Sequence, residues 1–233
     1  MRPVDRNLVE DLVAANRILA SRGILDGFGH VSVRQAERPD RFLMARSMAP
    51  ALVTADDIVE HDLDGRAVAS GISTYLERFI HCEIYRARPD VHAIVHSHSP
   101  ALIAFGVVES TPLRAVCHTA AFLGTSTPVF EIREAAGPAT DMLIRSPELG
   151  RALTQSLGSS PLVLMRGHGS TVVGANLPQV VYRAIYAELN ARLQSEAMRS
   201  GAVTYLTEDE ARLAAETNDG AIWRSWELWR RAI

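Results

Sequence analysis

The chain has 233 residues, of which 47% are hydrophobic and 22% charged, with 15 Gly and 11 Pro. This length suits one large domain around a single core, and the composition excludes collagen-like, disordered and low-complexity proteins. Lys and Arg sum to 24 against 27 Asp and Glu, so the net charge of −3 has the wrong sign and size for a nucleic-acid partner.

The first third of the chain predicts a helix followed by antiparallel strands. Apolar residues over 5–22 recur at helical spacing, with Asp5 as the N-cap and Gly23 as the stop. The elements expected next are, in chain order, a half-buried strand at 29–34, its partner strand at 42–45, a short capped turn at 54–59 and a hairpin at 61–65 that ends in Asp-Gly.

The rest of the chain alternates helices and strands. Helices are expected at 75–86, 147–157 and 178–199, with a further helix opened by a capping box at Thr207, and strands at 91–97, 161–165 and 170–173. No repeat or linker interrupts this order, so we predict one α/β domain over residues 1–233 with a C-terminal helical tail. In that tail, Trp223, Trp226 and Trp229 form a stripe that predicts packing or an oligomer contact, with an aromatic substrate pocket as the alternative.

The sequence also bears on the cell compartment. Cys82 and Cys117 lie 35 positions apart, in neither a metal-binding nor a redox spacing. The longest apolar run, residues 101–108, is far shorter than a membrane span, and we find no apolar stretch of signal-peptide length near residue 1. We therefore expect a protein of the reducing cytoplasm with no membrane partner.

Three histidines carry the chemistry. His96 and His98 end a predicted strand, and residues two apart on a strand point the same way, so both imidazoles can reach one ion. His168 lies between two glycines, whose freedom suits a tight turn that presents the ring, and it is the best third ligand. Three His leave a coordination position open, which is typical of catalytic metal sites. The alternative is that these histidines are hydrogen-bonded core or surface residues.

Glu77 lies on the helix whose loop leads into that strand. A carboxylate near a metal ion can move protons to a carbon or an alkoxide. The alternative is a solvated side chain paired with Arg78.

Together these residues resemble the class II aldolase and adducin head family: Glu77, then His96-x-His98 beginning 19 positions later, then Gly-His168-Gly 70 positions beyond His98. Segments 29–34, 57–59 and 88–90 fall where that family has its counterparts, and the resemblance covers roughly residues 7–200. It implies a three-layer α/β/α domain around a central, mostly antiparallel sheet, and a homotetramer with active sites between subunits. It also implies that the three histidines bind a divalent metal and that Glu77 is the catalytic acid/base.

The sequence departs from the sugar-phosphate aldolases of that family where they hold the phosphate. An Asn of the family is His30 here, a Thr-Gly pair is Arg46-Ser47, and two serines before the catalytic Glu are Tyr75 and Leu76. We therefore predict a substrate without a phosphate ester, with His30, Arg46 and Ser47 as substrate-binding residues. Arg46 suits a carboxylate, and a structural ion pair is its alternative role.

His118 falls where those aldolases place a Tyr that donates a proton in a neighbouring subunit's site. An imidazole titrates near neutrality and can do the same, so we predict a catalytic role for His118, with simple packing as the alternative. His61, His81 and His92 are not predicted as ligands.

The leading hypothesis is a metal-dependent carbon–carbon lyase for a small, non-phosphorylated substrate that chelates through adjacent oxygens. A decarboxylase of a hydroxylated, dihydroxyphthalate-like aromatic carboxylate in aromatic compound catabolism is favoured. The alternatives are a class II aldolase that cleaves a hydroxy-oxo acid to pyruvate or an aldehyde, a non-haem iron oxygenase, and a non-enzymatic domain like the adducin head, against which the retained His and Glu argue. Zinc or manganese is the expected metal, and iron or cobalt also suits His ligands.

Overall fold

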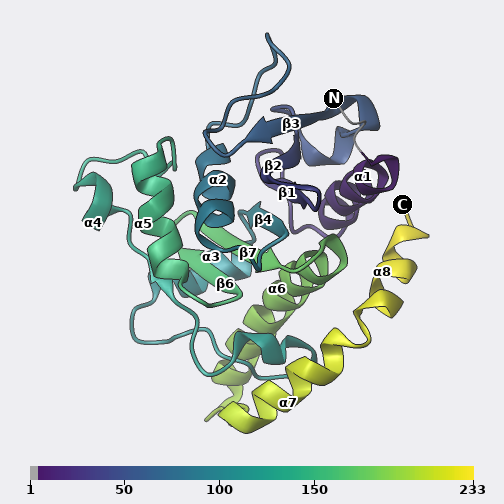
Figure 1. Cartoon of the computed structure of the whole chain (residues 1–233). Helices are drawn as coiled ribbons and strands as arrows, with labels where there is room; N and C mark the ends of the chain where they lie inside the picture. Colours follow the sequence, from purple (N-terminus) through teal and green to yellow (C-terminus); the bar gives the residue numbers. More distant parts are fainter. Residues whose placement is uncertain (1–4) are drawn as a thin grey trace.

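The computed structural model describes residues 5–233, and its centre is a seven-stranded sheet in the order β3-β2-β1-β4-β7-β6-β5 (Figure 1). Neighbouring strands are antiparallel except for β5 and β6, which are parallel. The strands are β1 His30–Gln35, β2 Arg38–Ala45, β3 Ile58–Asp62, β4 Ala93–Ser97, β5 Val129–Phe130, β6 Leu162–Met165 and β7 Gly169–Gly174. The predicted mostly antiparallel sheet is confirmed.

Helices cover both faces of the sheet, with α2 and α5 on one side and α1 and α6 on the other (Figure 1). The helices are α1 Arg6–Ser21, α2 Arg78–Ala87, α3 Pro100–Val107, α4 Arg133–Ala136, α5 Pro147–Leu157, α6 Leu177–Ser200, α7 Glu208–Asp219 and α8 Ile222–Arg230, with short 3₁₀ helices η1 Pro50–Leu52, η2 Ala55–Asp57 and η3 His118–Leu123. The predicted α/β/α layering is therefore confirmed.

Alternation along the strands divides the core into two layers. In β4, Ala93 and Val95 pack with α1 and α6, whereas Ile94 packs with α2 and α5 on the other face. Because side chains two apart share a face, His96 lies on the α2 side of the sheet with Ile94. The same alternation that builds the core therefore aims the first metal-ligand candidate at the start of α2.

Local signals placed several helix ends correctly. The Asp5 side chain accepts a hydrogen bond from the amide of Asn7, and Thr207 forms the predicted capping box with Glu210. Pro147 begins α5 as predicted. The domain prediction began at residue 1, and residues 1–4 lie outside the described part of the chain.

The predictions need correction at two places in the chain. The helix expected from residue 75 begins at Arg78, because the Tyr75 hydroxyl donates to the carbonyl oxygen of Met48 at 2.6 Å and holds the chain outside the helix. The apolar run at 101–108 was not predicted as a helix, but most of it lies in α3. The Ala101 amide, in the first turn of α3, donates to the Glu188 carboxylate of α6, a distant cap that no local pattern reveals.

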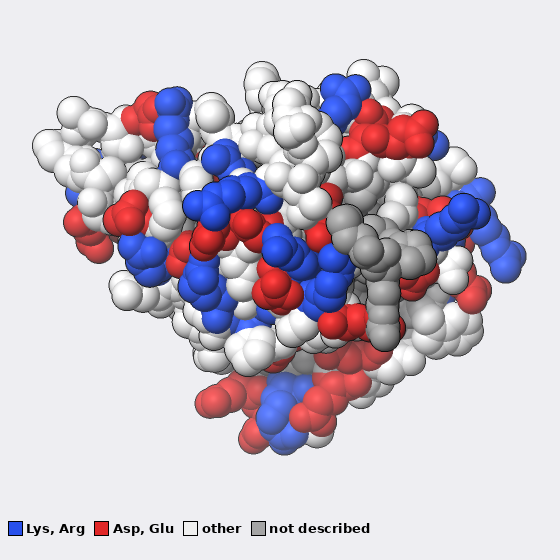
Figure 2. Space-filling view, turned by 45° about the horizontal axis from the view of Figure 1, so that its top comes forward, with Lys and Arg blue, Asp and Glu red and all other residues white. Residues whose placement is uncertain are grey.

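Among residues 5–233, no helix is both long and apolar enough to cross a membrane. The face drawn in Figure 2 carries acidic and basic side chains interspersed with one another. This pattern agrees with the small net charge of the sequence.

The three tryptophans of α8 have unlike surroundings. Trp226 and Trp229 are buried in the layer that contains α1 and α6, and the guanidinium of Arg22 lies 5.7 Å from the centre of the Trp229 ring. Trp223 is 58% exposed. Two of the three tryptophans therefore serve packing, as predicted, and fasten the C-terminal helices to the domain.

This difference predicts that the tryptophans contribute unequally to stability. Trp229→Ala should lower the free energy of unfolding by about 3–5 kcal/mol, because it empties a buried aromatic site. Trp223→Ala is the matched control and should change it by no more than about 0.5 kcal/mol. Urea denaturation followed by circular dichroism measures both, and equal losses would contradict the assignment of Trp229 to the core.

Candidate metal centre

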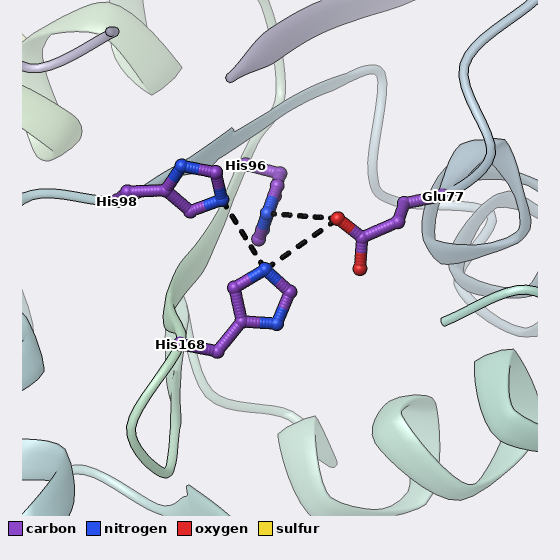
Figure 3. Close-up of side chains that lie close together, drawn as sticks. All are labelled: Glu77, His96, His98 and His168. Atoms are coloured by element: carbon purple, nitrogen blue, oxygen red, sulfur yellow. Dashed lines mark hydrogen bonds and ion pairs between the residues drawn. The ribbon is translucent and has the colours of Figure 1, made fainter. Parts of the chain in front are cut away.

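Four side chains far apart in sequence converge at one end of the sheet (Figure 3). His96 is near the end of β4 and His98 follows that strand, His168 lies in the turn between β6 and β7, and Glu77 is the N-cap residue of α2. Antiparallel pairing of β4 with β7 brings the end of one strand beside the start of the other. The fold therefore brings together the three predicted metal ligands and the predicted acid/base Glu77.

Glycines on both sides of His168 shape the turn that presents its ring. Gly167 has a φ of +67°, a conformation that favours glycine. A Cβ on Gly169 would lie 2.1 Å from the carbonyl oxygen of Ser97, so β7 packs against β4 as only glycine permits. The predicted role of the two glycines is confirmed.

Three atom pairs of the cluster are spaced as ligand atoms around one metal ion are. The Nε2 atom of His168 lies 3.2 Å from that of His98 and 3.5 Å from Oε2 of Glu77, and Nε2 of His96 lies 3.6 Å from the same oxygen. An ion with bonds of about 2.1 Å separates its ligand atoms by roughly 3.4 Å. The Nε2 atom of His96 is also buried without a hydrogen-bond partner, as expected for an atom that binds a metal.

Further groups orient three of the four side chains. Nδ1 of His98 lies 3.0 Å from a carboxylate oxygen of Asp26, and Nδ1 of His168 lies 3.0 Å from the carbonyl oxygen of Met142. The amide of Ile144 donates to Oε1 of Glu77 at 2.9 Å, which leaves Oε2 for the cluster. The partners of His98 and His168 hold these two imidazoles in the tautomer whose Nε2 lone pair faces the cluster.

Sequence analysis missed Asp26 and the segment 142–144. Asp26 is 72 positions from His98, and no spacing rule joins a loop carboxylate to a histidine at that separation. Backbone groups such as the Ile144 amide carry no side-chain signal at all.

Burial and charge set the protonation of the cluster. Burial lowers the pKa of His96 to about 3, so this imidazole is neutral. Burial alone would raise the pKa of Glu77, but the imidazoles of His96 and His168 outweigh it and hold that pKa well below its ordinary value. Burial opposes charge on His168 as well, but Glu77 outweighs it and raises the His168 pKa. Without a metal, Glu77 therefore favours a proton on His168.

His30 lies beside His96, on the neighbouring strand β1. It is paired across the sheet with His96, with ring centres 5.0 Å apart, and is only 1% exposed. Its Nδ1 atom lies 2.7 Å from His81, which lies 2.6 Å from the Ser32 hydroxyl, which in turn lies 2.7 Å from the hydroxyl of Tyr85. Burial lowers the pKa of both His30 and His81 well below 6.5. Within this chain the ring of His30 packs against the ring of His96. The predicted contact of His30 with the substrate stays a prediction.

The other predicted substrate residues lie on the loop after β2. Nε of Arg46 donates to the Asp57 carboxylate at 2.7 Å, so the ion pair weighed as its alternative role is present, although the side chain is 49% exposed. Ser47 is exposed, and its amide donates to the carbonyl oxygen of Ser73. Of the two residues that replace serines, Tyr75 is buried, whereas Leu76 is 55% exposed.

His118 is not brought to the cluster within this chain. It is exposed at the start of η3, and its carbonyl oxygen accepts a hydrogen bond from Asn218 of α7. An exposed position apart from the cluster is compatible with the predicted reach toward a neighbouring subunit, which a single chain does not test.

A pocket of about 730 Å³ lies at the opposite end of β1 and β4, beside Arg34 and His92. The guanidinium of Arg34 does not serve as an anion site, because its nitrogens donate to backbone carbonyl oxygens of Pro39, Tyr85, Arg88 and Val91. The side chains suited to metal chemistry are at the other end of the sheet.

Comparison with known proteins relates this chain to one family and to two decarboxylases. Residues 10–195 match the family model described as the class II aldolase and adducin N-terminal domain. Decarboxylase tropJ of Talaromyces stipitatus is 35% identical, over 97% of this chain and 93% of its own. The 3,4-dihydroxyphthalate decarboxylase of Arthrobacter keyseri is 32% identical, over 82% of this chain and 79% of its own.

A solved structure of L-fuculose 1-phosphate aldolase superposes with a TM-score of 0.79. It covers 93% of this chain and 98% of its own, at 22% sequence identity. This likeness concerns the fold, and it agrees with the architecture predicted from the sequence.

The raised pKa of His168 predicts how metal binding depends on pH. Below that pKa a proton held by Glu77 occupies His168, so zinc must displace it and the apparent affinity should fall about tenfold per pH unit. The same proton stabilises the metal-free fold below pH 6.5, and this stabilisation is lost as the pH rises through the raised pKa. Calorimetric zinc titrations in buffers of different ionisation enthalpy measure the released proton.

His96→Ala should abolish zinc binding at every pH. His92→Ala, in the pocket at the far end of the sheet, is the matched control and should preserve both affinity and proton release. A zinc affinity that does not change between pH 5.5 and pH 8 would contradict the pairing of His168 with Glu77.

Proposed function

The chain belongs to the class II aldolase and adducin N-terminal domain family, and from this membership and its site we infer a metal-dependent lyase that removes carbon dioxide from a hydroxylated aromatic carboxylate. This inference depends on the cluster of one carboxylate and three imidazoles, whose ligand atoms all lie within 4.8 Å of one another. Two decarboxylases that are at least 32% identical to this chain over the aligned residues support the reaction. The sequence prediction of a decarboxylase agrees with these relatives.

We assign the metal to His96, His98 and His168, with zinc or manganese favoured and iron or cobalt also suited to imidazole ligands. A bound divalent ion would polarise adjacent oxygens of the substrate and stabilise the negative charge left when the carbon–carbon bond breaks. The chain's own contribution is to keep His96 neutral through burial and to orient His98 and His168 through the partners of their Nδ1 atoms.

Glu77 is assigned the proton transfer. It is 7% exposed and, with its lowered pKa, starts as a carboxylate, so Oε2 can accept the proton of a substrate hydroxyl. When carbon dioxide leaves, the same oxygen returns the proton to the ring carbon, and the substrate oxygen regains one from water. The Ile144 amide fixes Oε1, so Oε2 stays toward the reacting carbon.

The substrate end of the site supports a carboxylate rather than a phosphate ester. Arg46 and Ser47 lie exposed on one loop, and Leu76 replaces a hydroxyl donor with an apolar side chain. Arg46 keeps Asp57 as a partner through Nε and, at 49% exposure, is assigned the substrate's second carboxylate. His30 is assigned to the base of the same site.

The assembly is proposed to be a homotetramer of the cytoplasm with active sites between subunits. The exposed position of His118, away from its own cluster, supports this arrangement, in which His118 completes a neighbour's site. Sedimentation velocity tests the tetramer. Mixing inactive His118→Ala and Glu77→Gln subunits should restore turnover in hybrid tetramers, and no restoration would place His118 outside the site.

The reaction itself is tested with the metal-loaded protein and a panel of dihydroxyphthalates and 4-hydroxy-2-oxo acids. We expect carbon dioxide from the aromatic acids at equal rates under nitrogen and under air, detected by mass spectrometry. Pyruvate or an aldehyde would instead establish the aldolase, and turnover only in air would establish an oxygenase.

Replacement of Glu77 separates proton transfer from metal binding. Glu77→Gln should lower kcat by roughly 10²- to 10⁴-fold, the usual contribution of general acid–base catalysis, because the amide cannot carry the proton. Metal content, measured by atomic emission, should stay near one ion per chain, whereas His96→Ala should lose both metal and turnover. Loss of the metal from Glu77→Gln would show that Glu77 serves mainly as a ligand.

A further inference from the structure

An aromatic side chain lies in solvent beside the metal centre. Phe28 is 76% exposed, and its ring centre is 6.4 Å from that of His98, with the two ring planes inclined by 44°. Single exposed apolar residues are common on protein surfaces and need no special explanation. The position of Phe28 beside a metal-ligand candidate, and the way its backbone is held, distinguish it from such residues.

The backbone of Phe28 is fixed to the metal centre by one carboxylate. Oδ1 of Asp26 accepts hydrogen bonds from the amides of Phe28 at 2.8 Å and Gly29 at 3.1 Å, while Oδ2 lies 3.0 Å from Nδ1 of His98. Gly29 adds a steric constraint, because a Cβ there would lie 3.0 Å from the carbonyl oxygen of His96. The loop that carries Phe28 is therefore held to His96, near the end of β4, and to His98, which follows that strand.

A second exposed apolar residue precedes Glu77 in the sequence. Figure 3 shows His98 and Glu77 approaching the cluster from opposite sides. Phe28 accompanies His98, and Leu76, which is 55% exposed, immediately precedes Glu77. Exposed apolar residues thus neighbour His98 in space and Glu77 in sequence.

We propose that Phe28 is a specificity-determining residue whose ring contacts the aromatic ring of a metal-chelating substrate, with Asp26 as the residue that positions it. This inference rests on the proposed function for the substrate class and extends it to the residue that selects an aromatic ring. A planar substrate that chelates through adjacent oxygens must project its ring away from the ion, toward the rim where Phe28 lies. Aromatic rings pair favourably in tilted or offset arrangements, whereas an aliphatic chelator gains little from Phe28.

The test uses two bidentate probes on the zinc-loaded full-length protein: 4-nitrocatechol, which is aromatic, and acetohydroxamate, which is aliphatic. Phe28→Leu should weaken 4-nitrocatechol roughly 2- to 10-fold, the range of one lost aromatic pair, and change acetohydroxamate less than 2-fold. Phe28→Tyr keeps the ring and should bind both probes like the parent. Trp223→Leu removes a comparably exposed aromatic ring on α8 and is the matched control for both probes.

Equal weakening of both probes in Phe28→Leu would overturn the proposal, because it would place the effect on the metal centre, and so would no weakening of 4-nitrocatechol. A change of sedimentation coefficient in Phe28→Leu would also overturn it, by making Phe28 a subunit contact. These results are independent of turnover: a protein that releases no carbon dioxide but shows the probe selectivity would refute the decarboxylase and leave the aromatic contact of Phe28 standing.

Discussion

A buried carboxylate among imidazoles is the constraint on which the rest of the structure depends. Glu77 is 7% exposed, and removing a charge from water is unfavourable unless positive charge lies nearby. A proton on the neighbouring His168 supplies it, because Glu77 raises the pKa of that imidazole, whereas burial keeps His96 neutral. A divalent ion would supply it more effectively, so the arrangement that is awkward for a structural core suits a metal site.

The sheet order explains why the chemistry gathers at one end. With β4 between β1 and β7, and both neighbours antiparallel to it, the end of β4 meets the starts of the other two strands. His96 thus lies in a strand, and His168 lies in the short turn between two paired strands, which limits the movement of both residues. The groups assigned to select the substrate, Phe28, Arg46 and Leu76, lie on connecting segments, which can differ among relatives without disturbing the ligands.

Much of the fold could be predicted because its signals are local. Asp5, Thr207 and Pro147 each mark a helix start through bonds within a few residues, and the strands of the centre alternate with period two. The errors arose where a distant partner decides. Tyr75 leaves the helix pattern because its hydroxyl reaches Met48, and α3 begins where Glu188 of another helix caps it.

The sequence by itself determined the metal-ligand candidates, because His-x-His at a strand end and Gly-His-Gly in a turn are short-range patterns with few structural solutions. Its periodicity indicated one α/β domain, and the family resemblance implied the layered α/β/α fold. Only the tertiary structure decided which groups orient those ligands, that His30 lies beside His96, and which aromatic residue stands at the site. Trp226 and Trp229 are buried in the core, whereas Phe28 lies beside His98. The sequence patterns predicted no role for Phe28. These choices depend on contacts between residues dozens of positions apart, and their distances are set by how the sheet and helices pack rather than by spacing along the chain.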